Sequence, residues 1–198
     1  MIIARKLRQQ NLAEYLLYMW QVEDILRAFH TDADTIAEQY LSRFQLKDEK
    51  TMQEMKQWYA DLCRMMHEEG VTEHGHLQIC QNVLIQLKDT HRLAMKCGKH
   101  PAYAAAYHRI LPFIVELRAK SKQAQDTSNP SELSKSSPAS LPEIDTAFEF
   151  LYGIMLCRLQ HREITQPTQD AAQQLSHWLG MLSELFFRQK EHPEQFED

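Results

Sequence analysis

Two charged residues stand where the helical periodicity of the sequence requires apolar side chains. In residues 14–29, EYLLYMWQVEDILRAF, Glu23 projects from within a broad apolar arc on a helix of 3.6 residues per turn. Arg158 projects in the same way from the apolar side of the later segment FEFLYGIMLCRL. Because charges inside a core persist mainly when they are paired, we predict that Glu23 and Arg158 form an ion pair across the helices.

Several interpretations of these polar residues stay open. The predicted pair either fixes the packing register or lines a polar pocket. Arg27, one turn after Glu23, offers a local alternative, an i, i+4 ion pair at the rim of the core. His91 lies in the middle of another apolar stripe, where it is either a buried, hydrogen-bonded imidazole or a ligand of the same pocket.

Histidines and cysteines are numerous, with 10 His and 4 Cys, but their spacing is not that of a metal site. Cys63 and His67 could share a helix face, but zinc needs four ligands, and a second such pair near residue 97 is expected roughly 25 Å away. Only Glu73 and His76 match the Glu-x-x-His spacing that di-iron bundles use twice. We therefore predict no metal site and no cofactor.

No arrangement typical of a nucleophilic enzyme is present. The sequence contains neither a GxSxG elbow nor a characteristic setting for a reactive cysteine, so no catalytic residue is assigned and a non-enzymatic role is favoured. Whether Cys63 and Cys80 approach closely enough to react under oxidation is left open.

Composition restricts the partners and the compartment. A net charge of −5 and a pI near 6.1 provide no basic footprint for nucleic acid. No window approaches the roughly 20 apolar residues that span a bilayer, so no membrane helix is expected. The amino terminus has no small-residue cleavage site, and no CxxC pair occurs, which favours a cytoplasmic protein with reduced thiols.

Apolar periodicity predicts an all-α fold of about seven helices in a bundle. The helix over about 48–69 and the next, ending near residue 97, are expected to form an αα-hairpin. Pro112 lies within a later helix and should bend it. The other expected helices run from before Asn11 to about Phe29, from a cap at Thr31 to about Phe44, from Ile144 to Leu159 and onward from Pro167.

We expect one helical domain over 1–198. Five helices fall within 1–122, and residues 123–141, rich in Ser, Pro and Gln, are expected to form a mobile linker because they cannot bury enough area to become ordered. Two further helices within 142–190 should pack on the first part of the chain.

Three segments resemble a bacterial family of about 200-residue proteins that is catalogued only as a domain of unknown function. They are the opening MIIARKLRQQNLAEYLLYMWQVEDILRAF, the central HPAYAAAYHRILPFIVELR and the later FEFLYGIMLCRL. The resemblance covers essentially the whole chain and implies an intracellular, all-helical protein from bacteria of the gut type. It implies no activity, cofactor or site residue.

The sequence therefore favours a helical protein that works through contacts with itself, as a homodimer, or with another protein. The alternative is a small-molecule or metal-binding bundle with an internal polar pocket near Pro112, lined by Glu23, His91 and Arg158.

Overall fold

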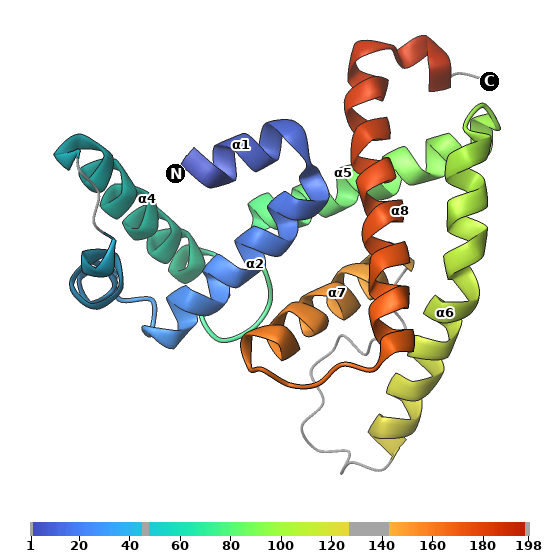
Figure 1. Ribbon diagram of the computed structural model, residues 1–198. Helices are drawn as coiled ribbons and strands as arrows, with labels where there is room; N and C mark the ends of the chain where they lie inside the picture. The colour runs from blue at the N-terminus through green and yellow to red at the C-terminus, as the bar shows by residue number, and fades with distance from the viewer. Residues whose placement is uncertain (1, 45–47, 127–142, 197–198) are drawn as a thin grey trace. The chain divides into compact units, whose positions relative to one another are not determined.

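The described parts of the chain are helical and contain no strand, which confirms the predicted all-α fold (Figure 1). The computed structural model describes residues 2–44, 48–126 and 143–196, and within 121–126 only the backbone. Eight α-helices, α1 to α8, lie in these ranges. The chain divides into two compact units, unit 1 over Met1–Ile85 and unit 2 over Gln86–Asp198.

Unit 1 is built on the apolar faces of its longer helices. The central helix α2 supplies most of the core, including Leu16, Met19 and Leu26, which are almost completely buried. The elements of unit 1 are α1 (Ile2–Gln10), α2 (Leu12–Ala28), α3 (Ala33–Thr35), a π-helical turn (Ile36–Tyr40), a 3-10 turn (Leu41–Arg43), α4 (Glu49–Glu68) and the first part of α5 (Gln78–Cys97).

The first predicted helix is in fact two helices, with the break at Asn11. The backbone of Asn11 is extended, with φ −153° and ψ 102°, and its side-chain oxygen accepts hydrogen bonds from the N–H groups of Ala13 and Glu14. This is the geometry of an N-cap, which Asn favours because its short side chain satisfies free N–H groups. Apolar periodicity continues through the break, so it concealed the cap.

The next cap also differs from the prediction. Asp32, not Thr31, caps α3 by accepting a hydrogen bond from the N–H of Thr35 at 2.6 Å. Thr31 has a φ of 54° and is buried, and its hydroxyl lies 2.9 Å from Nε2 of His67 on α4. The threonine therefore connects the turn after α2 to α4 instead of starting a helix.

The two helices predicted over 48–97 are present as α4 and α5. Asp48 caps α4 through the N–H groups of Lys50 and Thr51. Residues 69–77 join the two helices as a loop. Since α5 begins only at Gln78, the loop leaves room for the polar contacts described below.

Unit 2 consists of the rest of α5 and three long helices that pack on one another. They are α6 (Pro101–Asp126), α7 (Glu143–Leu159) and α8 (Gln166–Glu191), followed by a 3-10 turn (Pro193–Phe196). Trp178, Phe148 and Ile114 are fully buried between them. The last two helices thus pack on α6, and α6 runs through Pro112 and bends along its length (Figure 1).

The predicted linker overlaps the end of α6. Residues 123–126 belong to this helix, and residues 127–141 lie outside the described residues. The single domain predicted over 1–198 stays a prediction.

Replacing Asn11 by alanine should lower the free energy of unfolding by about 1 kcal/mol, because two N–H groups of α2 lose their acceptor. Asn11→Asp, which keeps an acceptor oxygen, is the matched control and should stay close to wild type. Urea unfolding measures both. Equal stability of the Asn11→Ala variant and wild type would contradict the cap.

Candidate functional site

Glu23 is a buried charge of unit 1, and each oxygen of its carboxylate has a hydrogen-bond contact with the segment just before α5. Its side chain is 1% exposed. One oxygen lies 2.6 Å from Nδ1 of His76, and the other accepts the backbone N–H of Leu77 at 3.0 Å. In the pair of an ionised Glu23 with His76, Nδ1 is the donor, because an ionised carboxylate can only accept hydrogen bonds. Glu23 is therefore buried, as its place in the apolar arc indicates, but its partner is a residue that the sequence pattern did not pair with it.

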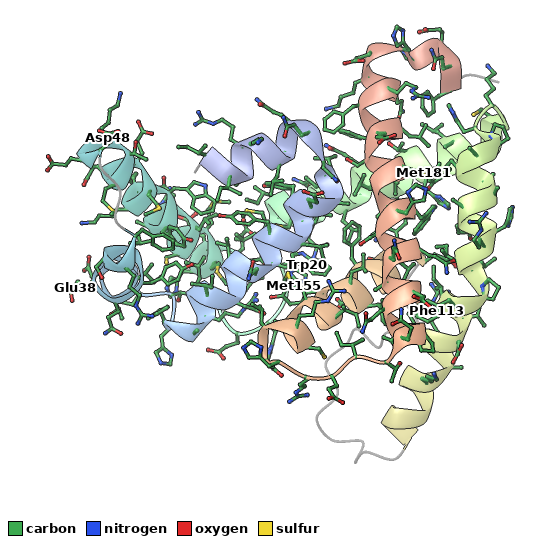
Figure 2. All side chains as sticks on the ribbon, in the orientation of Figure 1. Trp20, Glu38, Asp48, Phe113, Met155 and Met181 are labelled. Atoms are coloured by element: carbon green, nitrogen blue, oxygen red, sulfur yellow. The ribbon has the colours of Figure 1, made fainter. Side chains whose placement is uncertain are left out.

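Trp20 fixes the orientation of His76. This indole, one turn before Glu23 on α2 and labelled in Figure 2, stacks on the imidazole with ring centroids 4.1 Å apart and planes 12° apart. The His76 side chain is 24% exposed, and Nε2 is the ring nitrogen that the Glu23 contact leaves uncommitted. A carboxylate-oriented imidazole of this kind has a defined tautomer and a defined direction.

Arg27 holds the same loop from the other side. One of its terminal nitrogens pairs with Asp24 at 2.9 Å, and the other donates to the backbone carbonyls of Val71, at 3.3 Å, and Gly75. The predicted i, i+4 pair with Glu23 is therefore replaced by an i, i+3 pair with Asp24. Gly75 has a φ of 90°, a backbone conformation that residues other than glycine rarely adopt.

Cys80 lies one turn beyond His76 and is 1% exposed. Burial, and then the negative charge of Glu23, raise the pKa of this thiol. Burial, with a smaller effect of Asp32, raises the pKa of Cys63 to about 11. Because the thiolate is the reactive form, these shifts lower the reactivity of both buried cysteines.

Arg158 does not occupy the buried position expected from the sequence. It is exposed, at the C-terminal end of α7 in unit 2, where the helix reaches solvent. Glu23 in unit 1 has its hydrogen bonds within its own unit. The pairing of Glu23 with Arg158 stays a prediction. It was expected because a buried carboxylate needs a partner, and His76 and Leu77 are partners of this carboxylate.

His91 is the centre of an aromatic cluster in unit 2. Its Nδ1 lies 2.6 Å from the hydroxyl of Tyr103, and its ring meets Tyr107 at 4.9 Å and Trp178 at 5.8 Å between centroids. Burial lowers the pKa of His91, and the charge of Glu143 counteracts part of this effect. This environment fits the hydrogen-bonded imidazole that was one of the two sequence-based alternatives.

Charged pairs attach the start of α7 to the neighbouring helices of unit 2. Lys88 on α5 pairs with Asp145 at 2.7 Å, and Arg118 on α6 pairs with Glu143 at 3.2 Å. Arg118 also donates to the hydroxyl of Thr146 at 3.2 Å. Acidic residues in the first turn of a helix interact favourably with the helix dipole, and here they also form ion pairs with cationic side chains.

Two kinds of site can be assessed from these positions. Within the described residues, no three His, Cys, Asp or Glu side chains gather closely enough to hold a metal ion. No described helix is both long enough and apolar enough to cross a membrane.

The structure is that of an all-α protein. Its buried carboxylate, Glu23, and its histidines form hydrogen bonds that hold helix ends and loops in place. Residues 1–193 match the family described as "Domain of unknown function (DUF4924)". The chain belongs to this family, as its resemblance implied. Comparison with curated proteins and with solved structures finds no match.

Replacing Glu23 by glutamine should lower the free energy of unfolding by about 1–3 kcal/mol, since the half-buried imidazole of His76 and the backbone N–H of Leu77 lose a charged acceptor. Asp24→Asn is the matched control, because this neighbouring carboxylate is 44% exposed and should matter little. Urea unfolding at pH 7 compares the two. A Glu23→Gln variant as stable as wild type would contradict the role assigned to this carboxylate.

The free energy of unfolding should also fall in mild acid, because two histidines of unit 2 have lowered pKa values. Burial lowers the pKa of His91, and burial with nearby Arg188 and Lys99 lowers that of His100. In the unfolded chain these histidines have a pKa of about 6.5, and in the folded chain their pKa is lower. Below about pH 6.5 the unfolded chain therefore binds more protons than the folded chain. The stability present above that pH is lost as the pH falls toward the pKa values of the folded chain.

The His91→Gln variant should lose less stability than wild type between pH 7.5 and 5.5, as measured by urea unfolding at several pH values. His108→Gln changes an exposed histidine of α6 and is the control. If His91→Gln and wild type lost the same stability over this range, the buried imidazole would not be the group responsible.

Proposed function

We propose that this protein works through protein–protein contacts, with a second copy or another polypeptide bound in a groove between α6 and α8. The observation that carries the proposal is the groove itself, a hollow of about 420 Å³ in unit 2. The residues that line this groove belong to α6 and α8, and these two helices lie side by side (Figure 1). Grooves between two helices commonly accept an amphipathic helix or an extended segment of a partner.

The lining combines apolar contact area with charges of both signs. Phe113, labelled in Figure 2, is half-buried and packs edge-on against Phe150 at 5.1 Å, so it is a fixed anchor point. The apolar lining residues are Ile110, Pro112, Phe113, Pro167 and Ala171, and the polar ones are Arg109, Glu116, Asp170 and Gln174. An apolar centre with a polar rim is the usual anatomy of a protein interface.

Pro112 adds a backbone feature to this wall. It has no N–H, so the carbonyl of His108 lacks its helical hydrogen-bond donor. The mixed charges at the rim and the net charge of −5 are compatible with a protein partner and unsuited to a polyanion.

The alternative function, a ligand pocket formed jointly by Glu23, His91 and Arg158, has less support. Glu23 and His91 each have hydrogen-bond partners within their own units, and Arg158 is exposed. A cytoplasmic setting is part of the proposal, because all four cysteines are free.

The test is native mass spectrometry of the protein purified gently from cells that make it. We expect a homodimer or a defined complex with one other protein. Ala171→Arg places a long cation in the groove and should weaken the assembly at least tenfold. Val115→Arg adds the same charge at a position that is 57% exposed on α6 and does not line the groove, so it should leave the assembly intact.

Two results would contradict the proposal. One is a wild-type protein that is monomeric at every concentration and carries no partner. The other is an assembly that survives Ala171→Arg as well as it survives Val115→Arg.

A further inference from the structure

A separate pocket in unit 1 has the composition of a binding site for a small anion. Its volume is about 260 Å³, near the lower limit for small-molecule sites. The amino-terminal helix α1 contributes Arg5 and Arg8 to one wall, and Trp58 of α4 and Ile79 of α5 contribute to the rest of the lining. With Tyr15 and Met19 of α2, four helices of one unit therefore line it.

The charge of this pocket is positive. The helix α1 carries Arg5, Lys6 and Arg8 and no acidic residue. No acidic residue lines the pocket, and within the described part of unit 1 neither arginine forms an ion pair. The nearby carboxylate of Glu23 is occupied by His76 and Leu77. Two guanidinium groups at a concave surface, in a chain of net charge −5, are an unusual local concentration of positive charge.

Arg8 is held in place by an aromatic ring. Its guanidinium carbon lies 5.8 Å from the centroid of Tyr15, a cation–π distance. Tyr15 is 3% exposed, and burial raises the pKa of its phenol, so the hydroxyl is neutral and its oxygen accepts a hydrogen bond from Arg8. A guanidinium oriented in this way loses less rotational freedom when it binds an anion.

The remaining lining is apolar. Met19 and Ala4 are buried, and Trp58 is half-buried with its ring edge-on to Tyr59 at 5.1 Å. A bare inorganic anion would leave these surfaces without contacts, whereas a ligand with an apolar body would cover them. Carboxylate is the anion that matches the planar fork of arginine and is commonly attached to such a body.

We propose that this pocket binds a small organic carboxylate, with its carboxylate paired to Arg5 and Arg8 and its apolar body against Trp58. The site is independent of the proposed groove, which lies in the other unit and is lined by different helices.

The probe is phenylacetate, and phenylacetamide is its neutral analogue of the same shape. Binding is followed by the indole N–H signal of Trp58 in nitrogen-15 spectra of the full chain, identified by its absence from Trp58→Phe. We expect phenylacetate to shift this signal with a dissociation constant of about 1 mM, and phenylacetamide to bind at least tenfold more weakly.

Arg8→Gln should weaken phenylacetate binding at least tenfold, and Arg5→Gln should have an effect in the same direction. Arg43→Gln, an exposed arginine of unit 1 that does not line the pocket, is the matched control and should bind as wild type does. Thermal melting of each variant verifies that the fold is retained, which is expected because Arg5 and Arg8 are exposed.

Three results would overturn the proposal. The first is no shift of the Trp58 signal up to about 20 mM phenylacetate. The second is equal binding of acid and amide, or undiminished binding to folded Arg8→Gln. The third is a response to inorganic phosphate at the same concentrations as phenylacetate, which would mean that the pocket recognises a bare anion and not an organic carboxylate.

Discussion

The buried carboxylate of Glu23 is the interaction on which the arrangement of unit 1 depends. Removing an ionised carboxyl group from water costs several kcal/mol unless hydrogen bonds replace the lost hydration. Here His76 and the N–H of Leu77 replace it, and both belong to the segment that starts α5. The first N–H groups of a helix have no acceptor within the helix, so the carboxylate supplies one and stabilises the start of α5. In return, these N–H groups stabilise the buried negative charge.

The same segment is held by three side chains, the carboxylates of Glu23 and Glu69 and the guanidinium of Arg27. Glu69 accepts the N–H of Gln78 at 2.6 Å, and Arg27 binds carbonyl oxygens of the loop. Acceptors thus meet the N–H groups at the helix start, while a donor meets the carbonyls before it. Because this loop is held in place, α5 begins at a defined residue, Gln78. Residues of α5 belong to both units. In unit 2 the start of α7 is held differently, by ion pairs between side chains: Lys88 with Asp145 and Arg118 with Glu143.

The two candidate binding surfaces differ from these buried clusters in one respect. The polar groups of the clusters are largely satisfied by one another, so a ligand would have to break hydrogen bonds to use them. The groove of unit 2 and the basic pocket of unit 1 instead present side chains at concave surfaces where a bound molecule would add contacts. This is why we assign binding to the surfaces and structural roles to Glu23 and His91.

The sequence by itself determined the all-α class and the places of most helices, because apolar spacing and helix ends are local properties. It also indicated that Glu23 is buried. It concealed the break at Asn11, since the apolar arc continues across that residue, and it favoured Thr31 over the neighbouring Asp32 as a cap. Only the tertiary structure decided the partners of Glu23 and Arg27 and the exposure of Arg158. Glu23 and His76 are far apart in the chain, and which side chain meets a buried charge depends on how a loop closes and on which helix face it meets, neither of which periodicity encodes.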